Sequence, residues 1–190
     1  MTPTAPLKII AIGGSVRPDN YTMRALRVVV DQLERTEGVE VQLVDPVTIE
    51  WPAPGLDGGG PELVAFQEAV RAADGVILAS PEYHGSISSV LKRIIENLGY
   101  PNGLAGKPVA MLGVAAGVIG AIQTLGQLRG IISHVGGLPL PGAVSVPKVQ
   151  EVFDEAGNCT DEGMEKFIRG LADGLVRYLR DPIPSRASSS

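Results

Sequence analysis

The chain has 190 residues, a formal net charge of −5 and 44% hydrophobic residues. This composition supplies a substantial apolar core and excludes disordered, collagen-like and disulfide-rich proteins. Because no block of Lys and Arg stands out in this acidic chain, we expect no nucleic-acid partner.

Two segments of the sequence bear on the cellular location of the protein. Residues 1–7 lack the basic start and the apolar stretch of a secretory signal peptide. The longest apolar run, residues 109–122, is interrupted by glycines and is shorter than the roughly 20 residues that span a bilayer. We therefore expect a cytoplasmic protein with no membrane association.

Apolar runs of strand length alternate along the chain with segments of helical periodicity. Residues 7–12 predict a strand covered on both faces, residues 20–36 an amphipathic helix, and residues 39–44 a more exposed strand. Residues 45–61 are rich in proline and glycine and predict a loop, which is followed by a short helix over 62–72. Trp51 and the glycines at 58–60 in this loop could border the site as a mobile flap, and a flexible linker is the simpler interpretation. The later predicted elements are strands at 75–80, 107–113 and 138–146 and helices at 87–98, 119–135 and 161–179.

This alternation predicts parallel strands joined by right-handed crossovers. Five strands match a flavodoxin-like, doubly wound sheet of order 2-1-3-4-5 with helices on both faces. We expect one domain over residues 1–182 and a mobile tail over 183–190. Ligands of such sheets bind beyond the carboxyl ends of the strands where the strand order reverses, so the loops after the first, third and fourth strands form the candidate site.

The first of these loops, residues 13–22, has the chemistry of a phosphate site. Arg17 supplies a planar cation near the start of the first helix, and Ser15, Asn20 and Thr22 supply hydrogen-bonding groups. The loop contains neither a P-loop motif nor GxGxxG, which argues against a Rossmann-type dinucleotide site. The alternative is that Asn20 or Thr22 only caps the helix and that Arg17 is a solvated surface residue.

The second loop follows a buried strand and could border a planar heterocycle. Gly85 would allow close approach of the backbone to the ring, and Tyr83 or His84 would pack nearby. The alternative is that Ser86 or Ser88 caps the next helix while Tyr83 covers the end of the sheet.

The third loop, residues 113–120, is apolar and rich in glycine. It could lie against a flat ring without adding charge. Tight packing between strand and helix would demand the same glycines, so this loop alone does not decide between the two interpretations.

Taken together, Gly14-Ser-Val-Arg17, Asn20-Tyr-Thr22 and Pro81-Glu-Tyr-His-Gly-Ser86 resemble the NADPH-dependent FMN reductase family, which includes quinone, azo and chromate reductases. The resemblance covers essentially the whole chain and implies bound FMN, with NADPH or NADH as co-substrate. The residues that it implies are Ser15, Arg17, Asn20, Tyr21 and Thr22 at the FMN phosphate, Pro81, Glu82, Tyr83, His84, Gly85 and Ser86 around the flavin ring, and Ala115, Ala116 and Gly117 on the other side of the ring.

The chain departs from the family's usual residues at three of these positions. Asn20 stands where the family often has Ser, and Thr22 stands where it often has Asn. Both keep hydrogen-bonding groups, so we expect phosphate binding to survive. His84 replaces a frequent Asn, which puts substrate access and flavin potential in question.

The resemblance implies an enzyme that passes hydride from NAD(P)H to FMN and then reduces a small acceptor: a quinone, a flavin, an azo compound or a metal oxyanion. Because both reactants would use one site in turn, we expect ping-pong kinetics. The flavin carries this chemistry, so no catalytic side chain and no metal are assigned. The alternatives are a flavodoxin-type electron carrier fed by a protein partner and an interaction module without flavin. The helices at 87–98 and 119–135 have apolar residues on more than one face, which suits either a dimer interface or packing on their own sheet. The resemblance implies a homodimer or homotetramer.

Overall fold

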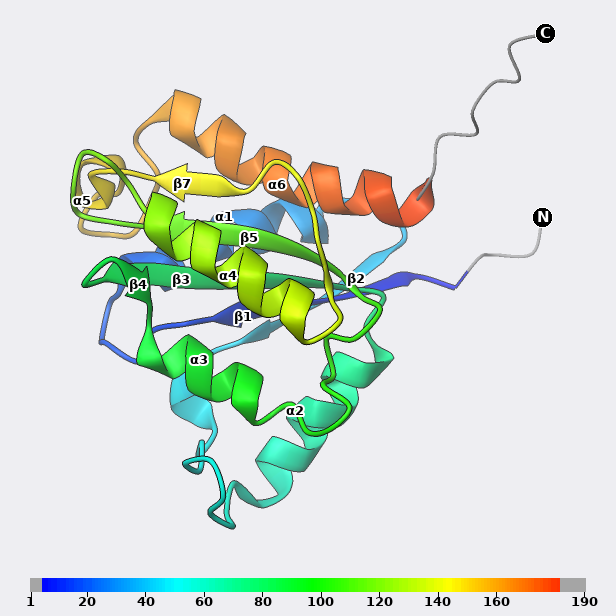
Figure 1. Ribbon diagram of the computed structural model, residues 1–190. Helices are drawn as coiled ribbons and strands as arrows, with labels where there is room; N and C mark the ends of the chain where they lie inside the picture. The colour runs from blue at the N-terminus through cyan, green and yellow to red at the C-terminus, as the bar shows by residue number, and fades with distance from the viewer. Residues whose placement is uncertain (1–4, 182–190) are drawn as a thin grey trace, which may run out of the picture.

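The computed structural model describes residues 5–181, so the predicted tail at 183–190 lies outside the described residues (Figure 1). Across this described range, no helix combines the length and apolar character that crossing a membrane requires. The elements are β1 (Leu7–Gly13), α1 (Tyr21–Glu34), β2 (Val39–Val44), the 3-10 helix η1 (Pro46–Thr48), α2 (Gly60–Ala72), β3 (Gly75–Tyr83), β4 (Ser86–Ile87), α3 (Ser89–Glu96), β5 (Pro108–Val114), α4 (Ile122–His134), β6 (Leu138–Pro139), β7 (Val144–Val146), α5 (Val149–Val152) and α6 (Glu162–Arg180).

The sheet confirms the predicted flavodoxin-like order. Its strands run β2-β1-β3-β5-β6 and are parallel along this path, while β7 also pairs with β5 in parallel and β4 pairs with β3 in antiparallel. The last strand differs from the prediction, because residues 138–146 form two short strands instead of one. Pro141 and Gly142, the latter at φ 79°, lie between β6 and β7 and interrupt the strand.

Helices cover both faces of this sheet (Figure 1). The side chains of β1 show why, since they alternate between two buried clusters. Ile9 and Ala11 pack with α1 and α6, whereas Ile10 and Ile12 pack with α2, α3 and α4. A strand that is buried on both faces needs a continuous apolar run, as residues 7–12 have.

Capping side chains fix the starts of three helices. Asn20 accepts a hydrogen bond from the Met23 N–H at 2.9 Å, so α1 begins at Tyr21. Ser88 caps α3 in the same way, and Asp161 caps α6. These caps shift the observed helix starts by one or two residues from the starts that hydrophobic periodicity predicts.

The segment between β2 and α2 is packed more firmly than the predicted linker. The Trp51 indole N–H donates to the Pro46 carbonyl oxygen at 2.8 Å, and its ring packs edge-on against Phe66 with centroids 5.1 Å apart. The Asn97 side-chain amide also donates to the Pro52 carbonyl oxygen at 3.0 Å. This segment is therefore anchored to α2 and to the end of α3.

Candidate functional site

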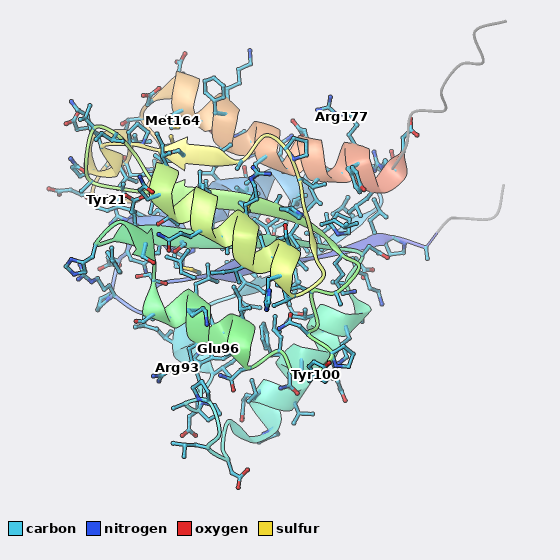
Figure 2. All side chains as sticks on the ribbon, viewed as in Figure 1. Tyr21, Arg93, Glu96, Tyr100, Met164 and Arg177 are labelled. Carbon is cyan, nitrogen blue, oxygen red and sulfur yellow. The ribbon has the colours of Figure 1, made fainter. Side chains whose placement is uncertain are left out.

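A pocket of about 420 Å³ lies where β3 and β5 end and α1 begins. Its volume falls within the range of small-molecule sites. Tyr21 lies at this end of the molecule, near α5, and Tyr100 lies at the other end (Figure 2). Residues from all three predicted loops line the pocket, which confirms that the topology brings these loops together. The lining residues are Arg17, Pro18, Asp19, Asn20, Tyr21, Thr22, Pro81, Glu82, Tyr83, Val114, Ala115, Ala116 and Val149.

Internal hydrogen bonds shape the first loop. The Asn20 amide donates to the Arg17 carbonyl oxygen at 2.7 Å while its oxygen caps α1. Ser15 is buried, does not line the pocket, and accepts a hydrogen bond from the Arg17 N–H at 3.4 Å. Within residues 5–181, the backbone N–H groups of Tyr21 and Thr22 donate no hydrogen bond. The start of α1 therefore presents two free donors and the positive end of the helix dipole.

The Arg17 guanidinium lies over the Tyr83 ring, 4.8 Å from the ring centroid. This cation–π contact joins the first loop to the end of β3. The contact thus places a cationic side chain at the wall of the pocket, on the side where α1 begins.

The second loop is a tight hairpin between β3 and β4. Tyr83 pairs with Ser86, and the two residues between them, His84 and Gly85, have φ values of 52° and 71°. A two-residue turn with positive φ at both positions has type I′ character and suits the right-handed twist of the strands. Type I′ turns strongly favour Asn followed by Gly, which explains why Asn suits the position of His84, directly before Gly85. Three predicted residues of this turn, His84, Gly85 and Ser86, do not line the pocket.

Helix α4 holds this hairpin through four hydrogen bonds. The Glu82 carboxylate accepts from the Thr124 N–H at 3.0 Å, and the Thr124 hydroxyl donates to the Ser86 carbonyl oxygen at 2.8 Å. The Gln127 amide donates to the Gly85 carbonyl oxygen at 2.8 Å, and the Ser86 hydroxyl donates to the Gln127 side-chain oxygen at 2.7 Å. The side chains of Glu82 and Ser86 therefore bind α4, whose residues Thr124 and Gln127 are not among the predicted site residues.

The third loop forms an apolar wall. Ala115 and Ala116 line the pocket with Val114 and Val149, whereas Gly117 lies outside it. The Ala115 backbone is held by hydrogen bonds to β7 and α5, since its N–H donates to the Val146 carbonyl oxygen at 3.0 Å and its oxygen accepts from the Val149 N–H at 3.1 Å. The contribution of Val149 could not be foreseen, because α5 was not predicted.

Residues 7–151 match the family described as NADPH-dependent FMN reductase. The chain belongs to this family. An NAD(P)H-dependent FMN reductase of Pseudomonas aeruginosa is 28% identical over 177 residues, which cover 92% of this chain and 96% of that protein. An NADPH azoreductase of a Bacillus species is 30% identical over 176 residues, 91% of this chain and 93% of that protein. The flavoenzyme NAD(P)H:(acceptor) oxidoreductase of Paracoccus denitrificans superposes with a TM-score of 0.74 at 27% identity, covering 92% of this chain and 97% of that one.

Membership in the NADPH-dependent FMN reductase family confirms the resemblance drawn from the loop motifs. The prediction of an FMN-dependent oxidoreductase that uses NAD(P)H agrees with this family and with the relatives' names. Because these named relatives are enzymes, the family favours a reductase over a pure electron carrier.

The pocket has the donors and the walls that FMN requires. The free N–H groups at the start of α1 and the Arg17 guanidinium suit a phosphate. The apolar wall of Val114, Ala115 and Val149 suits one face of a flat ring. Gly14 fits this arrangement as well, because an added Cβ would lie 2.6 Å from a backbone oxygen of β3 and would force the first loop away. These residues therefore fit an FMN in both halves of the pocket.

Proposed function

We propose that this protein binds FMN in the pocket at the carboxyl ends of β1, β3 and β5 and reduces small electron acceptors at the expense of NADPH or NADH. The observation that carries the proposal is that one pocket is lined by Arg17, by the start of α1 with its free N–H groups, and by an apolar wall. FMN, when bound, would supply the redox chemistry between the nicotinamide and the acceptor, and the protein would supply its binding and orientation. The quinone, flavin, azo and metal-oxyanion classes are the acceptors that we propose, in the cytoplasm, where NAD(P)H is available.

At the phosphate end, three groups would bind the ligand directly: the Arg17 guanidinium and the N–H groups of Tyr21 and Thr22. Ser15 and Asn20 would act one step away, because their side chains are already used to shape the loop. A hydrogen bond to a charged partner contributes about 1.5–3 kcal/mol, so Arg17 is expected to dominate the preference for a phosphorylated flavin.

At the ring end, the backbone of the β3–β4 hairpin would border the polar edge of the flavin. His84 and Gly85 lie outside the lining of the pocket and directly follow Tyr83, which lines it. Their N–H groups donate no hydrogen bond within residues 5–181, and both residues are exposed, so a ring that extends past Tyr83 could meet them. Such preorganised donors stabilise negative charge that develops in a reaction. Ala115 and Ala116 would cover one face of the ring and keep water from it.

The test compares FMN with riboflavin, which lacks the phosphate. We expect Arg17→Ala to weaken FMN binding about 10- to 100-fold and to change riboflavin binding little. Arg17→Lys keeps the charge, so its FMN affinity should lie between those of the wild type and Arg17→Ala. Arg27 is an exposed arginine of α1, and Arg27→Ala is the charge-matched control. Equal losses for FMN and riboflavin would contradict the role of Arg17. A wild-type protein that binds no FMN would refute the proposed function.

A second experiment separates an enzyme from an electron carrier. The absorbance of the FMN-loaded protein is followed anaerobically after NADPH is added, and rapid bleaching is expected. With NADPH and a quinone both varied, parallel initial-rate lines are expected for ping-pong kinetics, and intersecting lines would contradict it. Flavin bands that persist for minutes would support the carrier.

We also propose that two copies associate through α3 and α4. The groove between these helices has a volume of about 470 Å³ and includes Ile95 and Ile131. Ile122 on α4 is 58% exposed, and a Cβ added at Gly126 or Gly130 would meet nothing within 4 Å, so a second backbone could approach closely. A self-complementary face of this kind suits a two-fold dimer. Light scattering that shows only the monomer mass would refute it.

A further inference from the structure

The hairpin between β3 and β4 is too small to hold its own shape. Only two residue pairs join its strands, Glu82 with Ile87 and Tyr83 with Ser86. Its tip contains a non-glycine residue, His84, in the left-handed region at φ 52°. Isolated two-stranded hairpins are marginally stable in water, and this one also carries backbone strain. Contacts from outside the hairpin must therefore fix its conformation.

The hydrogen bonds that side chains of α4 donate to the hairpin all go to one kind of backbone group, the carbonyl oxygen. Thr124 and Gln127 donate to the carbonyl oxygens of Ser86 and Gly85, at 2.8 Å in both cases. Thr124 is fully buried, so its hydroxyl has no water to replace this bond. The N–H groups of the tip remain free in the described part of the chain. Helix α4 thus donates hydrogen bonds to the carbonyl oxygens of Gly85 and Ser86 and leaves the backbone N–H groups of the tip free to bind a ligand.

We infer that Thr124 and Gln127 are positioning residues for the flavin ring. This inference rests on the proposed function, because it assumes that FMN binds beside the hairpin. Bonding of the Gly85 and Ser86 carbonyl oxygens to α4 fixes the chain directly after the two free N–H groups of the tip, so the turn keeps one orientation in which these N–H groups are presented together. A site that is already ordered binds more tightly, since its affinity scales with the fraction of molecules in the competent conformation.

A positioning role and a purely structural role for Thr124 and Gln127 affect different measurable quantities. Weakened support would lower the melting temperature and leave the properties of bound flavin as they are. Loss of positioning would weaken the ring half of the site, so FMN and riboflavin would lose affinity by the same factor. It would also make the reduced flavin less stable and lower its midpoint potential, because donors beside a reduced ring stabilise its negative charge.

The experiment uses single substitutions in the full-length protein. Thr124→Val removes the hydroxyl and keeps the shape, while Thr124→Ser restores a hydroxyl. Gln127→Ala removes the donor to Gly85 together with the oxygen that accepts from the Ser86 hydroxyl. Gln123→Ala, at an exposed residue one turn earlier on α4, is its matched control. Light scattering checks that all variants keep the wild-type mass, because Gln127 also borders the groove between α3 and α4.

We expect Thr124→Val and Gln127→Ala each to weaken the binding of FMN and riboflavin about 3- to 10-fold, to lower the midpoint potential, and to speed amide exchange at Ser86, which pairs with Tyr83, in the flavin-free protein. Thr124→Ser and Gln123→Ala should stay near wild type. Wild-type protein that binds FMN, with unchanged affinity and potential in Thr124→Val and Gln127→Ala, would overturn this inference and leave the proposed function standing. A wild-type protein that binds no flavin would overturn both.

Discussion

Ser88 connects the first loop, β3 and α3 through hydrogen bonds, so its substitution should lower the stability of the fold. Its buried hydroxyl donates to the Gly14 carbonyl oxygen at 2.6 Å and accepts from the Leu91 N–H at 3.0 Å, while its own N–H donates to the Ser80 hydroxyl at 3.1 Å. Ser88→Ala removes an N-cap, which destabilises the fold by about 0.5–2 kcal/mol. It also leaves the buried Gly14 oxygen without a donor, which destabilises the fold by about 1–3 kcal/mol. We expect the free energy of unfolding to fall by about 2–4 kcal/mol.

Chemical denaturation followed by circular dichroism measures this loss. The slope of the free energy with denaturant should stay the same, since the buried surface is unchanged. Ser89→Ala is the control, because Ser89 is exposed and adjacent, and it should change stability by no more than about 0.5 kcal/mol. A loss for Ser88→Ala of under about 1 kcal/mol, or one equal to that of Ser89→Ala, would refute the role of this hydroxyl.

Three further changes test other contacts by thermal melting. Gly14→Ala should cost about 1–3 kcal/mol, because the new Cβ would lie 2.6 Å from a backbone oxygen of β3, whereas Gly117→Ala meets nothing within 4 Å and should be neutral. His84→Asn should stabilise the turn and His84→Val should destabilise it by about 1–2 kcal/mol, and the reverse order would contradict the left-handed conformation. The hydrogen bond from Arg169 holds the pKa of Asp31 below its ordinary 3.8, against a partial opposing effect of burial. The folded state therefore favours the carboxylate, and its contribution is complete above about pH 4 and is lost as the pH falls through the lowered pKa. Asp31→Asn should accordingly cost up to about 1 kcal/mol at pH 7 and progressively less below pH 4, and a difference that does not depend on pH would refute this.

Local sequence patterns predicted the fold because each of them reports burial directly. The continuous apolar run at residues 7–12 belongs to a strand that is buried on both faces, and helical periodicity located the helices to within a few residues. The meeting of the three loops followed from the strand order alone. Asn20, which the sequence left open between a cap and a ligand, is the cap of α1.

The parts that were missed depend on contacts between distant segments. Glu82 and Ser86 are bonded to residues 42 and 41 positions away on α4, and no local pattern carries that information. The strand Ser86–Ile87 is too short to produce an alternating pattern. The break between β6 and β7 had a local signal, since Pro141 and Gly142 lie within the predicted strand.

The packing of Trp51 against Phe66 gives the protein a natural optical probe. The chain contains 1 tryptophan, so its ultraviolet emission reports a single environment, on the α2 face of the sheet. A flavin at the carboxyl edge would give a visible signal from a different place. Heating the loaded protein while both signals are recorded would show whether the two regions melt together or in separate steps, which is the standard criterion of all-or-none unfolding.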